Sequence, residues 1–469
     1  MALPDLLQIN AWTGEIAGNR SAATTDVRTK LLQRGLVIPT PTLAPQQVEP
    51  DNWQDSRVGW GLVLADRKDL SVQQKASAED APEPLRMLLA KRGDAPVLRY
   101  DAEGQIGTLT RYYSDGSSQQ LAISALSYGT GRACIPRYLL IWGNPTVVPW
   151  SVQYELQTGY FVGRLDLEGN ALARYVAALV DEWKGKEPVL ANTTVWAVDH
   201  GTSDITHLML KAVAVPIHDE FKKDIDPEFN AGARLLIDQH ASCTALMNDL
   251  AERRPSLVVT SSHGATGPLS DVEQMRKSLG LMVDRDHTLL DVERLLEVWE
   301  PSGAIWFGQA CCSAGSAEAT AYERLVAPDS AVGRILTGVA RCGSIISPLP
   351  RSLLGAEVPL RAFVGHVEPT FDWTLRHPRT NQFLTRPLIR AFYNHLFLGK
   401  PVGMALAECR IAASSLNESY RIAVDSLRNG EDLAGEVFAL ELMSKDWRSL
   451  VLLGDPTCRL LNPPTAVGR

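Results

Sequence analysis

Short apolar segments rich in β-forming residues recur along most of the chain and constrain its fold more than any other feature. Amphipathic stretches with helical periodicity, such as ALARYVAALVDEW at residues 171–183, lie between several of them. Apolar strands that alternate with helices are typical of a mostly parallel sheet covered on both faces. The sequence therefore predicts an α/β protein whose mostly parallel sheet is flanked by helices, an α/β/α sandwich. The expected strands lie within 137–143, 159–167, 193–201, 233–240, 256–263, 304–311, 361–369 and 449–456.

The first 130 residues have a different character and are expected to form an N-terminal accessory or regulatory domain of mixed, β-containing structure. PTPTLAPQQVEPDNWQD and KASAEDAPEPL are rich in proline and acidic residues and are interpreted as loops. VLRYDAEGQIGTLTRYYSDGSSQQLAIS alternates apolar and polar residues around two turn sequences, which predicts a β-ribbon.

Composition excludes several classes of function. The 469 residues carry a formal net charge of −8 and no basic block, so neither nucleic acid nor an anionic membrane is an expected partner. Seven cysteines without a C-x-x-C pair argue against a disulfide framework or a structural zinc site. The N-terminus lacks the pattern of a secretory signal and no apolar run could span a membrane, so a cytoplasmic location is expected.

No cofactor or metal is expected either. The sequence contains no G-x-G-x-x-G after a strand and no G-x-x-x-x-G-K-[ST], the motifs typical of dinucleotide and nucleotide phosphate binding. The histidines that cluster in sequence do not have the spacing of a zinc site. They are His200, His207, His218 and His240.

Two predicted strands end on side chains that can do chemistry. SLVVTSSHG ends on His263 followed by Gly264, and AIWFGQACCSAGS delivers Cys311 among small residues. The carboxyl ends of parallel strands meet at one edge of a sheet, where Asp199 also lies. This predicts a Cys–His dyad in which Cys311 attacks a carbonyl group and His263 transfers a proton to the leaving amine.

The glycine and the small residues around the dyad favour a covalent mechanism over a buried core thiol. They leave backbone N–H groups free, and those of Gly264 and Cys311 are candidates for an oxyanion site. Cys312 is the rival nucleophile, but Cys311 is the residue at the strand end.

SSHG together with QACCSAG resembles the caspase-like cysteine peptidases, and the resemblance to the gingipain-type peptidases extends over about residues 135–460. YLLIWGNPTVVPW and YFVGRLDL are similar to strands of their N-terminal subdomain. TSDITHLML, VGHVEPTFDW, PVGMALAECR and WRSLVLLGDPTCRL have counterparts in the same order. The resemblance implies a gingipain-like subdomain at 131–188 and a caspase-like catalytic domain at 189–469.

The resemblance also implies roles for single residues. Cys311 is the expected nucleophile, His263 the acid and Asp199 the carboxylate that orients the histidine. Asp204 is expected at the floor of the S1 pocket and Trp373 at its wall. The implied activity is a thiol endopeptidase that cleaves protein or peptide substrates after Arg or Lys, with arginine favoured because its planar fork bonds a carboxylate bidentately.

Other interpretations of the same residues stay open. Asp204 at the start of a helix could be an N-cap, although Thr202 or Ser203 could take that position. The protein could be a catalytically inactive scaffold on a peptidase fold, or a Cys–His hydrolase or acyltransferase acting on a small substrate.

A peptidase of this specificity would need a gate, opened by a small-molecule or protein activator or by processing. The N-terminal region is the candidate, through aromatic residues that could stack a ligand. They are Trp12, Trp53, Trp60, Tyr112 and Tyr113.

Overall fold

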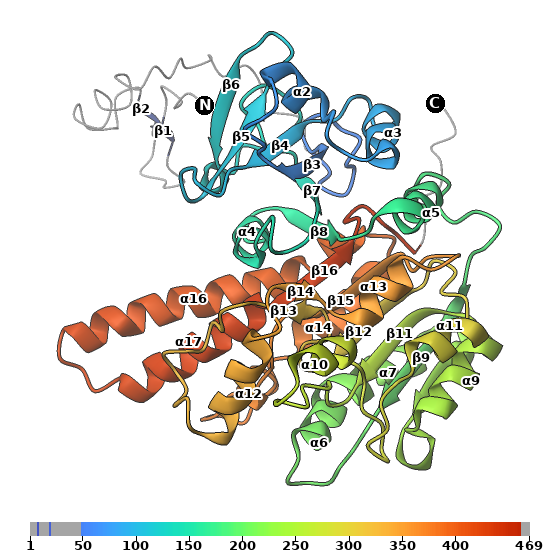
Figure 1. The fold of residues 1–469 in the computed structure, drawn as a ribbon. Coiled ribbons are helices and arrows are strands. Elements are labelled where there is room, and N and C mark those ends of the chain that lie inside the picture. Colours follow the sequence, from blue (N-terminus) through green and yellow to red (C-terminus); the bar gives the residue numbers. More distant parts are fainter. Residues whose placement is uncertain (1–6, 9–17, 20–47, 461–469) are drawn as a thin grey trace. The chain divides into compact units, whose positions relative to one another are not determined.

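The computed structural model describes residues 7–8, 18–19 and 48–460 of the chain (Figure 1). Two compact units are present, Met1–Glu49 and Pro50–Arg469. In the first, β1 (Leu7–Gln8) pairs antiparallel with β2 (Gly18–Asn19). Trp12 and most of the first unit lie outside the described residues.

One twelve-stranded sheet organises the second unit, with the strand order β10-β9-β11-β12-β15-β16-β8-β7-β3-β4-β5-β6. All the strands predicted from residue 137 onward are present. In chain order the twelve strands are β3 (Trp60–Ala65), β4 (Val97–Tyr100), β5 (Thr108–Tyr112), β6 (Ser118–Ala122), β7 (Tyr138–Trp142), β8 (Phe161–Leu165), β9 (Val189–Ala197), β10 (Ala233–Leu236), β11 (Pro255–Ser261), β12 (Ile305–Gln309), β15 (Ala362–His366) and β16 (Leu450–Gly454). A separate two-stranded sheet pairs β13 (Gly315–Ser316) with β14 (Ile345–Ile346).

The large sheet consists of two parallel blocks that run in opposite directions. Strands β10, β9, β11, β12 and β15 are mutually parallel, and so are β16, β8, β7, β3 and β4. The blocks meet at the antiparallel pair β15–β16, and β5 and β6 continue the second block as an antiparallel ribbon. The prediction of a mostly parallel sheet is therefore confirmed, and the sheet as a whole is mixed.

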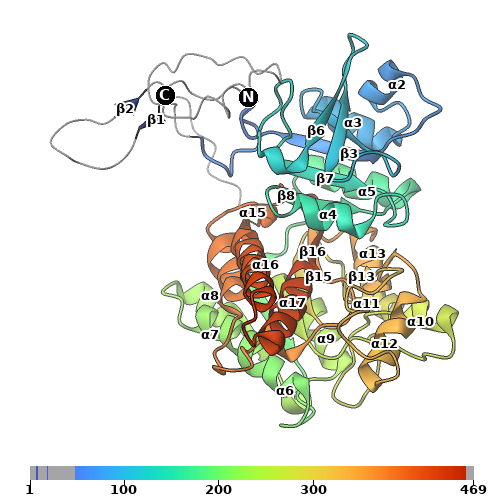
Figure 2. The ribbon, with the colours of Figure 1, turned by 90° about the vertical axis from the view of Figure 1, so that its left-hand side faces the viewer.

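Helices flank the sheet on both faces and complete the α/β/α sandwich (Figures 1 and 2). They are α2 (Val72–Ser77), α3 (Glu83–Lys91), α4 (Trp150–Leu156), α5 (Gly169–Val180), α6 (Ile205–Met209), α7 (Val215–Lys222), α8 (Pro227–Gly232), α9 (Cys243–Arg253), α10 (Val272–Ser278), α11 (Val292–Val298), α12 (Ala331–Ala340), α13 (Pro348–Leu354), α14 (Arg386–Arg390), α15 (Val402–Ala405), α16 (Ala407–Arg428) and α17 (Ala434–Arg448). Among the described residues, no helix has the length and apolar character needed to cross a membrane.

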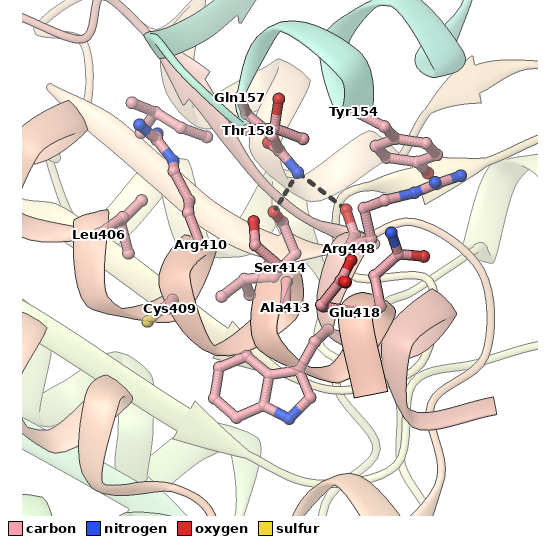
Figure 3. A pocket seen from close by; sticks show the side chains of 14 residues that line it. Tyr154, Gln157, Thr158, Leu406, Cys409, Arg410, Ala413, Ser414, Glu418 and Arg448 are labelled. Carbon is pink, nitrogen blue, oxygen red and sulfur yellow. Dashed lines mark hydrogen bonds between the residues drawn. The ribbon is translucent and has the colours of Figure 1, made fainter. Parts of the chain in front are cut away.

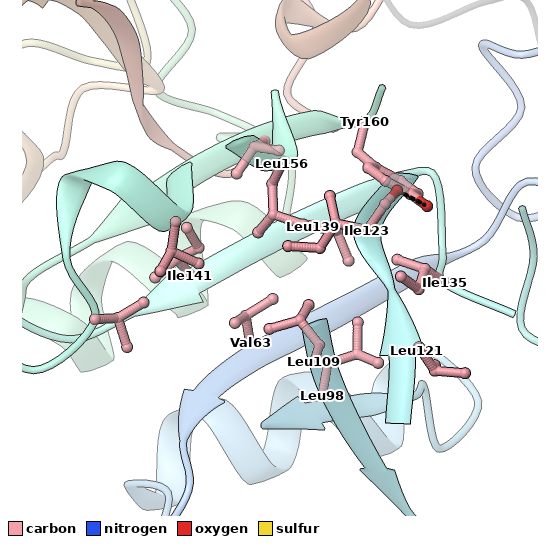
Figure 4. Close-up of a cluster of buried hydrophobic side chains, with 13 residues drawn as sticks. Val63, Leu98, Leu109, Leu121, Ile123, Ile135, Leu139, Ile141, Leu156 and Tyr160 are labelled. Carbon is pink, nitrogen blue, oxygen red and sulfur yellow. Dashed lines mark hydrogen bonds between the residues drawn. The ribbon is translucent and has the colours of Figure 1, made fainter. Parts of the chain in front are cut away.

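Residues on both sides of the predicted boundary at 130/131 share one buried core (Figure 4). Val63 of β3 and Leu98 of β4 pack in one cluster with Leu139 of β7 and Leu156 of α4, and all four are almost completely buried. Strand β3 lies between β7 and β4 in the sheet. The ribbon predicted for residues 97–124 is therefore part of the same sheet as the strands that follow it.

Candidate active site

Three neighbouring strands place their next side chains at one edge of the sheet. In the register of β9, β11 and β12, Ala197 lies opposite Ser261 and Ser261 opposite Gln309. Two residues beyond these partners, the chain reaches Asp199, His263 and Cys311. The sequence prediction that these residues share an edge follows directly from this alignment.

The main chains of the histidine and cysteine segments are in close contact. A Cβ atom on Gly264 would lie 2.0 Å from the carbonyl oxygen of Cys311 and 3.1 Å from its nitrogen. Only glycine allows this approach, which explains why His263 is followed by a residue without a side chain. Within the described residues, neither the Gly264 N–H nor the Cys311 N–H donates a hydrogen bond to another residue.

The carboxylate that contacts the catalytic candidate histidine is that of Asp204. Its Oδ2 lies 3.0 Å from Nε2 of His263, whose side chain is 38% exposed. Its Oδ1 accepts hydrogen bonds from the N–H of Thr206 at 2.8 Å and from the Thr206 hydroxyl at 2.6 Å. Burial by itself would raise the pKa of Asp204, but these donors outweigh it and hold that pKa below its usual value.

Asp204 is also the N-cap residue of α6, the structural role that the sequence analysis left open for it. Thr206 links this cap to the end of β9, because its hydroxyl accepts a hydrogen bond from the N–H of His200 at 3.0 Å. Capping and the contact with His263 thus use different oxygens of the same carboxylate.

Asp199 faces another histidine. Its Oδ2 lies 2.8 Å from Nδ1 of His207, and its Oδ1 accepts a hydrogen bond from the N–H of Gly201. The structure thus brings Asp199 to the predicted edge and gives the position beside His263 to Asp204. The turn from Asp199 to Asp204 decides this, and strand periodicity contains no information about it.

Cys311 and Cys312 lie in different surroundings. Cys312 is completely buried among Met275, Leu279, Val339 and Cys342, and burial raises the pKa of its thiol well above the usual value. Cys311 is half-buried as a residue and is the more accessible of the two cysteines.

The thiol of Cys311 contacts Thr370 in the loop after β15. The Thr370 N–H donates to Sγ at 3.4 Å, and the Thr370 hydroxyl lies 3.9 Å away. Burial raises the pKa of the Cys311 thiol, and the Thr370 donors offset this only in part. No hydrogen bond joins Sγ to His263 in the part of the chain that the structure describes.

His200 stacks beside His263 and also contacts His287, and sequence reasoning missed this cluster of three histidines. The ring of His200 lies 5.7 Å from that of His263 at an interplanar angle of 16°, and 4.4 Å from that of His287. Burial lowers the pKa of His200, and the charges of the other two imidazoles act in the same direction. The position of His200 directly after Asp199 at the end of β9 was the available signal.

A pair of buried carboxylates lies close to the loop that holds Cys311, and nothing in the sequence marked it. Asp446 of α17 accepts hydrogen bonds from the Phe371 N–H and the Thr374 hydroxyl. The carboxylate of Glu368 accepts from the N–H of Ala321. Burial raises the pKa of each carboxyl group to about 7. Buried His366 has its pKa lowered to about 3, so its 3.8 Å contact with Asp446 is not an ion pair at neutral pH.

An open pocket of 510 Å³ adjoins the edge of the sheet. Asp204, His207 and Asp372 contribute to its lining, together with Arg376 and Phe383. Trp373 does not line this pocket; its ring packs edge-on against Phe438, 5.7 Å away. Among the described residues, no group of three or more His, Cys, Asp or Glu side chains could hold a metal ion.

Comparisons with known proteins leave the family of this chain open. No protein-family model matches the sequence, and no curated protein matches it. A solved structure described as "Structure of Protease" is similar over 86% of this chain and 79% of its own, with a TM-score of 0.45 and 11% sequence identity. Because a likeness at that level carries no functional argument, a function can be argued only from the geometry of the site.

Proposed function

We propose that the protein is a cysteine endopeptidase in which Cys311 and His263 form the catalytic dyad. The observation that carries this proposal is the register of β11 and β12, which aligns the two residues at one edge with Gly264 against the Cys311 main chain. The burial of Cys312 supports Cys311 as the nucleophile, since a thiol without access to solvent cannot reach a peptide bond.

In the proposed reaction, Sγ of Cys311 gives its proton to His263 and attacks the carbonyl carbon of the scissile bond. The tetrahedral intermediate carries its negative charge on the former carbonyl oxygen, where the free N–H groups of Gly264 and Cys311 can donate to it. The intermediate then collapses to a thioester, and His263 returns the proton to the departing amine. Water hydrolyses the thioester and restores the thiol.

Asp204 takes the role that the sequence assigned to Asp199 in this proposal. With Nε2–H of His263 donating to Asp204, Nδ1 is the ring nitrogen left for proton exchange, and the carboxylate stabilises the imidazolium that forms. Asp199 acts on His207 instead.

The preference for Arg or Lys at the cleavage site is part of the proposal and rests on the pocket beside the dyad. Two carboxylates, those of Asp204 and Asp372, line it. Both oxygens of Asp204 already accept hydrogen bonds, whereas Asp372 is an exposed residue that lines the same pocket as Arg376. A basic side chain in this pocket would meet carboxylate oxygens, and the planar guanidinium of arginine can bond a carboxylate bidentately.

Latency is supported by the resting state of the thiol. A raised pKa and a contact with Thr370 rather than His263 describe a nucleophile that needs rearrangement before it reacts. We therefore propose that a ligand, a partner or processing activates the enzyme. All seven cysteines are free, which suits the cytoplasm as its compartment.

Cleavage of a peptide library with every residue at the P1 position tests the proposal, with cuts located by mass spectrometry. We expect cleavage after Arg or Lys that is lost in Cys311→Ala and kept in Cys312→Ala, because only the first variant removes the nucleophile. Selective labelling of Cys311 by an uncharged electrophile without peptide cleavage would indicate a hydrolase or acyltransferase for small substrates. Absence of selective labelling would indicate an inactive scaffold.

A further inference from the structure

A groove lies between the end of α4, helix α16 and the junction of α17 with β16 (Figure 3). A pocket of 310 Å³ forms one part of it, and a neighbouring pocket of 450 Å³ shares Gln157, Arg410 and Glu418 with the first. None of the lining residues belongs to the candidate active site. The volumes suit a small organic molecule.

The groove carries an excess of positive charge. Three guanidinium groups line it, those of Arg137, Arg410 and Arg448, against the single carboxylate of Glu418. Glu418 lies 3.2 Å from Arg421, and no carboxylate of the described residues forms an ion pair with any of the three lining arginines. Figure 3 shows Arg410 and Arg448 on either side of Gln157.

Protein groups satisfy these arginines only in part. Arg410 donates to the carbonyl oxygen of Tyr160 at 2.8 Å, and the Arg448 guanidinium lies over the ring of Tyr154 at 5.6 Å. Nε of Arg137 is buried without an acceptor in the described chain.

Two further observations indicate that the groove is built for a ligand. Trp447 lines it, is only 6% exposed, and has its indole N–H buried without a hydrogen-bond partner among the described residues. Burial lowers the pKa of Arg410 to about 10, and the nearby charge of Arg137 acts in the same direction. Unpaired buried donors and crowded cations are costly unless an anion meets them.

We propose that this groove binds a small phosphate-bearing molecule that acts as an effector of Cys311. A phosphate ester carries up to two negative charges and three acceptor oxygens, which matches the two positive charges in excess of Glu418. Arginine is the side chain best suited to such oxygens, since its fork bonds them in pairs. The hydroxyl of Ser414 supplies a further donor on the wall, whereas the hydroxyl of Thr158 already donates to the carbonyl oxygen of Glu155 at 2.8 Å.

The effector role rests on the proposed function, and the end of α17 provides the connection. Trp447 and Arg448 line the groove, while the adjacent Asp446 holds the Phe371 N–H. Phe371 follows Thr370, whose N–H donates to Sγ of Cys311. A ligand that shifts the last turn of α17 would therefore move the group that holds the thiol.

Isothermal titration calorimetry with AMP and with inorganic pyrophosphate on the full chain tests the site. We expect both probes to bind, and Arg137→Gln and Arg448→Gln each to weaken binding at least tenfold. Glu418→Gln should strengthen binding, a gain that misfolding cannot imitate. Arg428→Gln is the matched control. This arginine lies on α16, the helix of Glu418, but its side chain is exposed and paired with Asp425. The proposal would be overturned if neither AMP nor pyrophosphate gave a heat of binding. It would also be overturned if both arginine variants bound the probes as tightly as the wild type.

The rate at which iodoacetamide alkylates Cys311, followed by mass spectrometry, tests the connection without peptide cleavage. We expect AMP to change that rate several-fold in the wild type and not in Arg448→Gln. A probe that binds without changing the rate would refute the effector role. If AMP changed the alkylation rate but no peptide was ever cleaved, the ligand site in the groove would stand and the peptidase proposal would be overturned.

Discussion

The carboxylate beside an imidazole decides which nitrogen of the ring can exchange a proton, and here the choice lies between two aspartates five residues apart. Asp204 reaches Nε2 of His263, while Asp199 reaches Nδ1 of His207. The same Asp204 lines the pocket proposed for the basic side chain. Orientation of the histidine and recognition of the substrate are therefore separable only by experiment.

Asp204→Asn distinguishes the two roles because asparagine can still cap α6 through its Oδ1. If Asp204 orients His263, turnover should fall about a hundredfold or more, to a similar extent for an arginyl peptide and for an uncharged ester. If it binds the basic side chain, the loss should be confined to the arginyl peptide. Steady-state kinetics with both substrates measures the difference.

Asp199→Asn is the matched control for that experiment, since it removes the same charge from the other carboxylate. We expect kcat to stay close to the wild-type value. A fall in kcat as large as that of Asp204→Asn would return the orienting role to Asp199.

How far the sequence determines the site differs from one residue to the next. His263 and Cys311 could be placed because each ends an apolar strand, and parallel strands in register bring such ends together. The partner of His263 could not, because it depends on a loop whose path is set by the Thr206 hydroxyl and the cap of α6. Trp373 was placed at the pocket by resemblance, yet its ring packs against Phe438.

At the scale of elements, the segments that follow β11 and β12 can lie close together only because Gly264 has no side chain. Gly264→Ala would place Cβ 2.0 Å from the Cys311 carbonyl oxygen, so the two segments would have to move apart. We expect loss of cleavage and a destabilisation of about 1–3 kcal/mol, measured by urea unfolding.

Gly435→Ala is the control for that substitution. Apart from its chain neighbours and the backbone of its own helix α17, no atom lies within 4 Å of a Cβ added at Gly435. Stability should rise slightly, because alanine is the better helix former, and cleavage should not change. Full activity of Gly264→Ala would contradict the proposed geometry.

The elements that hold the Thr370 loop contain groups that titrate near neutrality. In the fold, the carboxyl of Asp446 has a pKa of about 7, above its unfolded value, so the folded state binds the proton more tightly. The stability that this group contributes is complete below the unfolded pKa and is lost as pH rises toward and through 7.

Asp446→Asn should therefore be more stable relative to wild type at pH 8 than at pH 5. Thermal unfolding of both proteins across this range measures the difference, which should increase with pH by at most about 1.4 kcal/mol per unit. A difference that is constant with pH, or that decreases as pH rises, would contradict the raised pKa.

Element prediction from sequence succeeded where burial imposes a pattern and failed where context decides. The strands from residue 137 onward could be predicted because they are apolar runs. The ribbon at 97–124 could be predicted because apolar and polar residues alternate along it. Strand β3, although almost wholly buried, lies in a region dominated by loop signals and was not predicted. The reversal of direction at β15–β16 also has no signature, since strand periodicity is the same in either orientation.

At the scale of the whole molecule, the first described part of the second unit is tied to the last strand. Asp455, which follows β16 and is completely buried, accepts a hydrogen bond from the indole N–H of Trp60 at 3.0 Å. Its Oδ2 lies 3.3 Å from Arg92, whose guanidinium lies between the rings of Trp53 and Trp60. Packing therefore accounts for these two tryptophans, which the sequence offered as candidates for stacking a ligand.

The other aromatic candidates of this region also have protein partners. The hydroxyl of Tyr112 donates to Asp66 at 2.6 Å, and the ring of Tyr113 lies under Arg132 at 4.2 Å. A gate formed by residues 1–130 stays a prediction.

Asp455→Asn tests whether residues 50–130 and the proposed catalytic region unfold together. The substitution leaves the Arg92 guanidinium almost completely buried without its anion, which should cost about 3–5 kcal/mol. Because β3, β7 and β16 belong to one sheet, we expect a single cooperative transition, shifted as a whole to lower denaturant. Fluorescence of the tryptophans and far-UV circular dichroism should give the same midpoint. Two transitions, of which only one moves, would show instead that the boundary near residue 130 separates independently folding domains.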